Sequence, residues 1–304
     1  MKRFLYNLLL LLSFFFLSGC QVDGWKAGSV TPIISPLPDA TLLYSSTPTP
    51  LQPTSTPTRF ISSKTPEVAA STLSPTSLHL TSTPIYKMCS PLAGISIGEL
   101  KSVVSNPFSA GRAGFDEGHP GIDFSYWSRG DRKSMQGHGI QSIFSGMVVS
   151  TIANRPPYGN SLIIKTQLPT LPSEVHKFLS DVKPIAAVIP DARLNCPGFQ
   201  LPSTNPPKQD ALYILYAHLD QPANLKIGQE VHCGDQIGQV GTSGFSVNYH
   251  LHLEIRFGPD GYVFTEMAHY DNAASPTEMR AYCTWRASGI FQALDPALVL
   301  GISR

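Results

Sequence analysis

The 304-residue sequence has little charge and no excess of either sign. Charged residues make up 14% of the chain, the formal net charge is +1 and the sequence pI is about 7.7. Proteins that bind a nucleic-acid backbone need clustered Lys and Arg, so we do not expect a nucleic-acid partner. The sequence also has no C-x-x-C pair and no H-E-x-x-H motif. These absences argue against a thiolate zinc or redox site and against a helical glutamate base.

Proline, in contrast, is abundant. The chain has 27 prolines, and the segment from Gln21 to Tyr86 is dominated by Ser, Thr and Pro, with near-repeats such as STPTP and TSTPT. Such a segment buries too little apolar surface to offset the entropy of ordering. We predict a disordered, extended tether over residues 20–87, which holds a globular domain at residues 88–304 away from a membrane.

The first 19 residues have the pattern of a secretory signal peptide. Lys2 and Arg3 are followed by a short apolar run from Leu8 to Leu17, which is too short for a comfortable membrane span. The stretch Leu17-Ser18-Gly19-Cys20 resembles a bacterial lipobox, so lipidation of Cys20 is predicted. The alternative is a plain signal peptide that contains a cysteine. We expect an extracytoplasmic protein, lipid-anchored to a bacterial membrane in the cell envelope.

Four further cysteines remain, at positions 89, 196, 233 and 283. Outside the cytoplasm an even number of cysteines favours disulfides. We predict two bridges, and all three pairings stay open.

The globular part reads as short strands separated by Gly, Asn and Asp. Strands are predicted at 139–150, 160–166, 212–220 and 249–257. The only convincing helix covers 173–182, with Ser173 as its cap. A long segment, 167–210, separates two strands that could otherwise form a hairpin, and insertions of this length are often functional. The predicted fold class is mainly β, an antiparallel sheet or sandwich with few short helices.

Two histidines stand out in the last of these strands. Because side chains alternate in a strand, Tyr249, Leu251, Leu253, Ile255 and Phe257 should form a core face, with His250, His252, Glu254 and Arg256 on a polar face or groove. Two imidazoles on one face lie about 6.5 Å apart, near enough to serve one reacting centre. We interpret Glu254 and Arg256 as a solvated or paired strand face.

A second group of candidate ligands precedes the strands. His119 and Asp123 are four residues apart, about 13 Å on a straight strand. Gly121 between them can adopt backbone angles that bend the chain, so that both side chains reach one point. His218 closes a mainly apolar strand, where a structural histidine would be the ordinary interpretation.

Taken together, these motifs resemble the lysostaphin/LytM-type zinc endopeptidases of bacterial cell walls. The resemblance rests on H-x-G-x-D at 119–123, Y-x-H at 216–218 and GTSGFSVNYHLHLEIR at 241–256, which occur in the family's order. It covers about residues 99–260, with Asp295-Pro296 resembling the family's usual close. It implies an antiparallel fold of the lysostaphin/LytM type, similar to duplicated hybrid motifs.

The resemblance also implies roles for individual residues. His119, Asp123 and His252 would hold one Zn²⁺ per domain, and His218 and His250 would be catalytic beside a zinc-activated water. Which of the two histidines is the general base stays open. The family's tyrosine upstream of H-x-G-x-D is missing here, and Tyr216 is the candidate for a transition-state or substrate contact.

The implied function is a zinc metalloendopeptidase that hydrolyses peptide stems or cross-bridges of bacterial peptidoglycan. One alternative is a non-catalytic module of the same fold that binds the cell wall and activates amidases. Such modules usually lack the zinc ligands, whereas all five expected positions are kept here. A secreted protease acting on proteins such as glycine-rich ones is a third interpretation.

Overall fold

The computed structural model describes residues 86–129 and 133–302. The predicted signal peptide, Cys20 and nearly all of the predicted tether lie outside these residues. Within the described ranges, no helix is long and apolar enough to cross a membrane.

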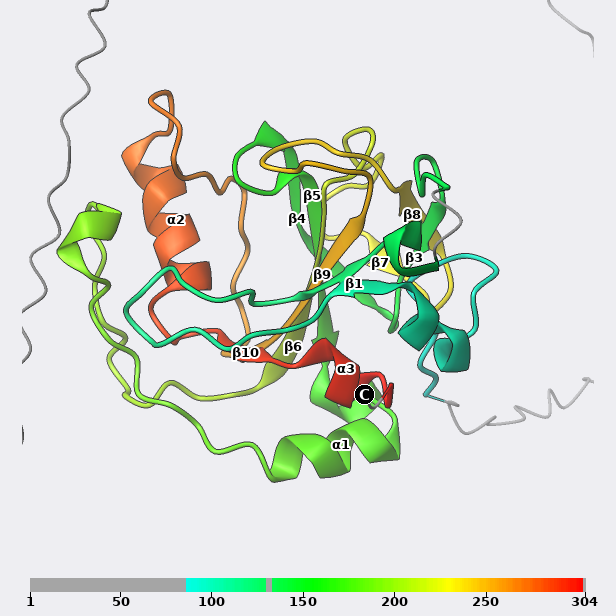
Figure 1. The fold of residues 1–304 in the computed structure, drawn as a ribbon. Coiled ribbons are helices and arrows are strands. Elements are labelled where there is room, and N and C mark those ends of the chain that lie inside the picture. Colours follow the sequence, from blue (N-terminus) through cyan, green and yellow to red (C-terminus); the bar gives the residue numbers. More distant parts are fainter. Residues whose placement is uncertain (1–85, 130–132, 303–304) are drawn as a thin grey trace, which may run out of the picture. The chain divides into compact units, whose positions relative to one another are not determined.

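The described chain is mainly antiparallel β-sheet, which confirms the predicted fold class (Figure 1). The strands are β1 (Val104–Asn106), β2 (Ile122–Phe124), β3 (Gly139–Gln141), β4 (Gly146–Arg155), β5 (Gly159–Gln167), β6 (Ala211–Ala217), β7 (Glu230–Val231), β8 (Gln236–Gln239), β9 (Leu251–Gly258) and β10 (Gln292–Leu294). The helices are η1 (Ile97–Val103), η2 (Tyr126–Arg129), η3 (Leu168–Thr170), α1 (Ser173–Ser180), η4 (Ala192–Leu194), α2 (Pro276–Arg286) and α3 (Pro296–Val299).

Strand β9 lies in the middle of the large sheet. The strand order is β1-β2-β9-β6-β5-β4-β7, and β10 also pairs with β9. Strands β3 and β8 form a separate two-stranded sheet. Because β9 pairs with β2, β6 and β10, all antiparallel, it joins segments that are far apart in the sequence.

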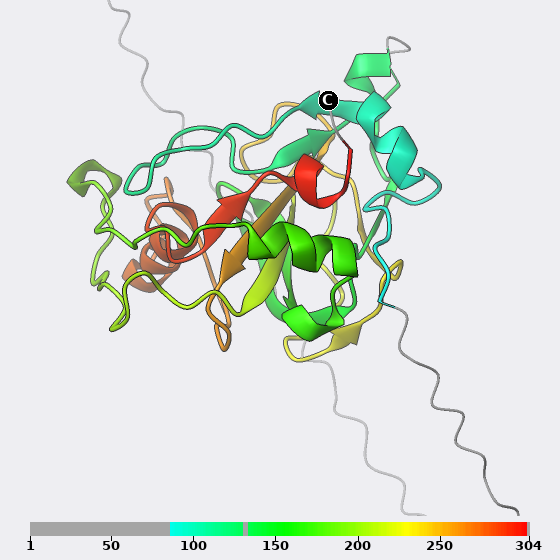
Figure 2. The same ribbon diagram turned by 90° about the horizontal axis from the view of Figure 1, so that it is seen from below.

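Both faces of the large sheet are covered by apolar side chains. One face carries Leu253, Ile255 and Ile214 and packs against α1 and α3, which lie together in Figure 2. The other face carries Tyr213 and Leu215 and packs against α2. Alternation within each strand therefore distributes its side chains between two cores rather than between a core and solvent.

The segment 167–210 is not structureless. Strands β5 and β6 pair antiparallel in spite of the intervening segment, with Gln167 opposite Ala211, and α1 lies between them in sequence. Val175 and Leu179 of α1 are buried in the first core. The helix begins at Ser173, but its cap is Pro172, so the predicted capping role of Ser173 is wrong.

The longest α-helix, α2, was not predicted. Its start nevertheless has a clear sequence signal, because Ser275 and Glu278 form a reciprocal capping box with Pro276 in the first turn. The Ser275 hydroxyl accepts from the Glu278 N–H at 3.2 Å, and the Glu278 carboxylate accepts from the Ser275 N–H at 2.8 Å.

Two disulfides are present, as predicted. Cys89 bonds to Cys233 and Cys196 to Cys283. The second bridge connects the 167–210 insertion to helix α2, and it thereby ties an external segment to an element that lines the site described next.

Candidate metal and catalytic site

Asp123 and His252 are direct neighbours across two strands. Asp123 on β2 pairs with His252 on β9, and the Asp123 Oδ1 and His252 Nδ1 atoms are 2.8 Å apart. His119 lies just before β2, where its backbone pairs with Ser109. Its Nε2 atom is 3.1 Å from Asp123 Oδ1 and 3.1 Å from His252 Nδ1. The three side chains predicted as metal ligands therefore converge on one point.

Gly121 lies at a bend of the chain between His119 and Asp123, as predicted, although it does not have the positive φ that many glycines of this chain have. It also contributes space. A Cβ at this position would lie 2.5 Å from the Leu253 carbonyl oxygen and 2.9 Å from His252 Cε1. Any larger residue would push the two strands apart where Asp123 and His252 meet.

The three atoms that face one another, His119 Nε2, His252 Nδ1 and Asp123 Oδ1, can all act as hydrogen-bond acceptors. His119 Nδ1 lies 2.9 Å from the Pro107 carbonyl oxygen, and His252 Nε2 lies 3.1 Å from Glu254 Oε1. When each ring carries a single proton on that outer nitrogen, His119 Nε2 and His252 Nδ1 have lone pairs that point at each other and at Asp123, as metal ligands do. Zinc bonds of about 2.0–2.1 Å at tetrahedral angles separate ligand atoms by about 3.3 Å. The donor set and its spacing fit a zinc ion.

Asp123 is held in its ionised form. Burial would raise the pKa of this carboxyl, but its close contacts with the rings of His119 and His252 outweigh burial and keep the pKa well below its usual range. The Asn106 amide donates to the second oxygen, Oδ2, at 3.1 Å. Asp123 thus presents Oδ1 to the two imidazoles in a fixed orientation.

His250 and His218 form a second pair beside these three. Their ring centres are 4.7 Å apart, and His250 Nε2 is 3.6 Å from Asp123 Oδ1. The Nδ1 atom of His250 is 2.9 Å from the Asn248 carbonyl, and that of His218 is 2.7 Å from the Ser243 carbonyl. Because carbonyls only accept, both rings carry their proton on Nδ1, and Nε2 is left as an acceptor when the ring is neutral.

The electrostatic setting keeps His218 uncharged. Burial, followed by repulsion from His252 and His250, lowers the pKa of His218 to about 3. A neutral imidazole with a free Nε2 can accept a proton or a hydrogen bond from a group in the groove. The groove itself has a volume of about 350 Å³ and is lined by all five of these residues.

The comparison with protein families agrees with this geometry. Residues 207–263 match the model of peptidase family M23. This segment therefore has the sequence pattern of peptidase family M23. The matched segment contains His218, His250 and His252, and the structure adds His119 and Asp123 from outside it. Comparison with curated proteins gives no match.

Several solved structures of peptidases are similar to this chain at low identity. The catalytic domain of lysostaphin from Staphylococcus simulans is 19% identical, with 65% of this chain and 89% of that chain covered and a TM-score of 0.31. The catalytic domain of the prophage-encoded M23 protein EnpA from Enterococcus faecalis is 18% identical, with 54% and 87% covered and a TM-score of 0.30. A zinc-containing peptidase from Vibrio cholerae is 19% identical, with 51% and 33% covered and a TM-score of 0.29.

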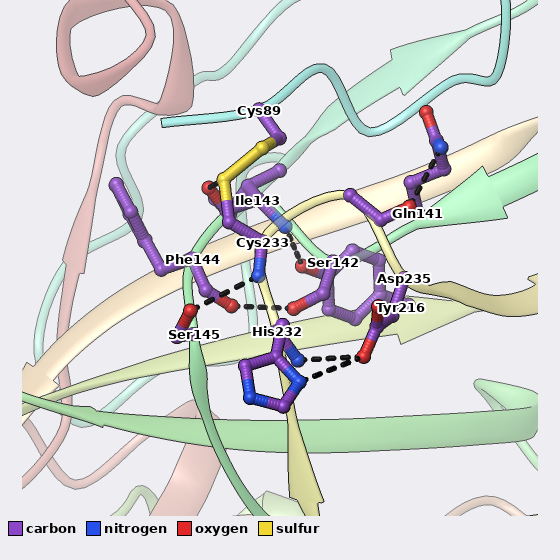
Figure 3. The surroundings of a disulfide bond; sticks show 11 residues. Cys89, Gln141, Ser142, Ile143, Phe144, Ser145, Tyr216, His232, Cys233 and Asp235 are labelled. Atoms are coloured by element: carbon purple, nitrogen blue, oxygen red, sulfur yellow. Dashed lines mark hydrogen bonds and ion pairs between the residues drawn. A yellow bond between two sulfur atoms is a disulfide. The ribbon is translucent and has the colours of Figure 1, made fainter. Parts of the chain in front are cut away.

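Tyr216 does not line this groove, so its predicted contact role is wrong. The side chain is fully buried in the core that faces α1, and its hydroxyl accepts from the Ile143 N–H at 2.9 Å. Figure 3 shows Tyr216 beside Ile143 and Ser142, near the Cys89–Cys233 disulfide.

The reason lies in the residue that follows the strand. Alternation places Tyr216 and Ala217 on opposite faces, and an extended residue 218 would share the face of Tyr216. His218 instead has a φ of 60°, which breaks the alternation and turns its ring toward His250 and His252. A left-handed histidine is uncommon, and its position at a functional site agrees with that rarity.

Tyr158 and Glu254 line the same groove, although the sequence analysis assigned them no catalytic or metal-binding role. The Tyr158 hydroxyl donates to Glu254 Oε1 at 2.6 Å, and both residues line the groove. Glu254 and Arg256 are paired and fully or almost fully buried, so the solvated interpretation of this strand face is wrong and the paired one is right. The sequence signal was the polar alternation that continues past His252 to Glu254 and Arg256.

The far wall of the groove comes from α2 and the segment before β2. Asp116 accepts from the Tyr282 hydroxyl at 2.6 Å and from Arg286 Nε at 2.7 Å, and all three residues line the groove. No residue of the 167–210 insertion does. The insertion contributes indirectly, since Cys196 holds α2 through Cys283.

Proposed function

We propose that this M23 domain is a zinc metalloendopeptidase that hydrolyses peptide stems or cross-bridges of bacterial peptidoglycan. The observation that carries the proposal is the convergence of three acceptor atoms, from His119, Asp123 and His252, beside two imidazoles whose Nε2 atoms are left as acceptors. A groove that contains both groups suits hydrolysis better than passive binding, because binding alone requires no pair of imidazoles with Nε2 directed away from the backbone.

His119, Asp123 and His252 would hold the ion, one per domain, and bound zinc would activate water and polarise the scissile carbonyl. Three protein ligands would leave one coordination position for water or substrate, as in other catalytic zinc sites. Gly121 keeps the strands close enough for this set, and Asn106 orients Asp123 within it.

His218 and His250 would handle the proton. With Nδ1 of each ring committed to a backbone carbonyl, Nε2 can take a proton from the attacking water and return it to the leaving amine. The second imidazole would accept a hydrogen bond at its own Nε2 atom and so orient the attacking water or the leaving amine. The approach of His250 to Asp123, at 3.6 Å, favours His250 as the residue nearer the attacking water.

The proposed location follows from the N-terminal sequence. Residues 1–19 would be a lipoprotein signal peptide, Cys20 the lipidated residue and 20–87 a tether to a bacterial membrane. A stalked domain, with two disulfides suited to an oxidising compartment, would then reach an immobile wall substrate from an extracytoplasmic membrane surface.

One experiment tests the enzymatic proposal. The purified protein is assayed for bound zinc and is then incubated with peptidoglycan sacculi, and released peptides and new amine termini are quantified. We expect about one zinc per chain and new termini. Stoichiometric zinc without new termini would contradict the enzyme and favour a wall-binding module that activates amidases. Cleavage of glycine-rich proteins but not of sacculi would contradict the substrate.

A further inference from the structure

We propose that Glu254 is a positioning residue that fixes His252 with its Nδ1 atom toward the metal ligands. This inference rests on the proposed zinc function. It concerns a side chain that does not itself belong to the group of three ligand atoms.

Glu254 is fully buried and its carboxylate accepts four hydrogen bonds. Oε1 accepts from the Tyr158 hydroxyl at 2.6 Å and from His252 Nε2 at 3.1 Å. Oε2 accepts from Arg256 Nε at 2.6 Å and from Trp285 Nε1 at 3.0 Å. With two donors on each oxygen, the carboxylate is acceptor-only and has no freedom to rotate.

This arrangement determines the tautomer of His252. Asp123 and Glu254 can both only accept, so in a ring that ligates a metal through Nδ1 the single proton is on Nε2, where it faces Glu254. The lone pair is then on Nδ1, the atom that lies 2.8 Å from Asp123 Oδ1. A histidine that ligates a metal commonly donates its other N–H to a carboxylate in this way, which orients the ring and raises its basicity.

Helix α2 holds the carboxylate from the other side. Arg256 Nη1 donates to the Trp285 carbonyl at 2.7 Å and to the Phe291 carbonyl at 3.1 Å, while the Trp285 indole donates to Glu254 itself. A glutamate present only to neutralise Arg256 would not need an oxygen shared between Tyr158 and His252. The division of donors between the two oxygens therefore points to a role toward His252.

Glu254→Gln tests this role with a nearly unchanged shape. Arg256 Nε and Trp285 Nε1 are obligate donors, so the amide oxygen must face them and the amide NH₂ must face His252. That orientation is satisfied when His252 accepts at Nε2 and moves its proton to Nδ1, which removes the lone pair needed for a metal. Tyr158→Phe is the matched control, because it removes a donor to the same oxygen but leaves the Glu254–His252 bond.

The measurement is the zinc dissociation constant, from competition with a chelator at constant pH, alongside the thermal stability of the metal-free proteins. We expect zinc affinity to fall by about 10–100-fold in E254Q and to change little in Y158F. Equal affinity in E254Q and wild type overturns the inference while the zinc function stands. An equal loss in E254Q and Y158F also overturns it, because general loosening would then explain the effect. Wild type that binds no zinc contradicts the proposed function itself.

A second measurement applies if E254Q does not fold. In the zinc-loaded wild-type protein, long-range ¹H–¹⁵N correlation spectra of His252 should show the proton on Nε2, in slow exchange with solvent. A proton on Nδ1, with Nε2 toward the metal, overturns the inference.

Discussion

The two faces of strand β9 are equally buried but are stabilised in different ways. All eight residues of the strand are buried. Leu251, Leu253 and Ile255 contact only an apolar core on one face. On the other face His252, Glu254 and Arg256 are linked to each other and to Tyr158 and α2 by hydrogen bonds. Burial stabilises the first set through apolar area, whereas the second set can be buried because most of its polar atoms are paired, Arg256 Nη2 being the exception.

This comparison separates stability from function. Truncation of a side chain on the apolar face removes packing contacts and lowers stability, but it does not change the hydrogen-bond donors and acceptors of its neighbours. A side chain lost from the polar face leaves buried donors and acceptors unpaired and changes the donor set of the site. Substitutions on alternate residues of one strand should therefore have effects of different kinds.

The largest expected effect is that of His252→Ala. The variant loses one of the three convergent ligand atoms, so it should lose stoichiometric zinc and its peptide release from sacculi should fall to background. Metal analysis and quantified amine termini check this outcome. Chelator treatment of the wild type should reproduce it, and added zinc should restore only the wild type. A zinc-replete His252→Ala protein would show that the ligand set is wrong.

His250→Ala and His218→Ala should retain zinc and lose turnover. Both rings face the groove without belonging to the ligand group, and removal of a general acid or base costs about 10²–10⁴-fold in rate. Zinc content and peptide release are measured on the same preparations. If His250→Ala loses as much zinc as His252→Ala, the separate roles assigned to the two residues are wrong.

Ile255→Ala tests the apolar face of β9. Ile255 is fully buried and pairs with Ile214 and Leu294 across the strands, so its truncation should cost about 2–5 kcal/mol of unfolding free energy. Zinc stoichiometry of the folded fraction should stay at the wild-type value. Denaturant unfolding with parallel metal analysis checks both, and loss of zinc from a still-folded variant would contradict the separation of the two faces.

The smallest effect is expected for Tyr216→Phe. The hydroxyl is bonded to Ile143 in the opposite core, so its loss should cost about 1 kcal/mol of stability or slightly more, with turnover unchanged. Thermal unfolding and peptide release measure the two quantities. A fall in turnover comparable to that of His250→Ala would show that Tyr216 does contribute to catalysis.

Most residues of the candidate site could be predicted from local sequence patterns. Alternation in 249–257 identified the polar face of His250, His252 and Glu254, and motif order brought in His119 and Asp123. The prediction for Tyr216 was wrong because it took the two residues of the Y-x-H motif to act together. The positive φ of His218 directs the two side chains to different faces of the sheet. The sequence patterns also missed α2, although Ser275 and Glu278 carried a capping signal.

The sequence by itself determined the class of fold and the chemistry available, because strand periodicity and residue type are local properties. Only the tertiary structure decided which side chains meet. The antiparallel pairing of β2 with β9 places Asp123 opposite His252, Gly121 leaves room for it, and Trp285 of α2 closes the hydrogen bonds of Glu254. The contact between Asp123 and His252 joins residues more than a hundred positions apart, and that between Glu254 and Trp285 joins residues some thirty positions apart. Their formation depends on strand register and packing, which no local pattern specifies.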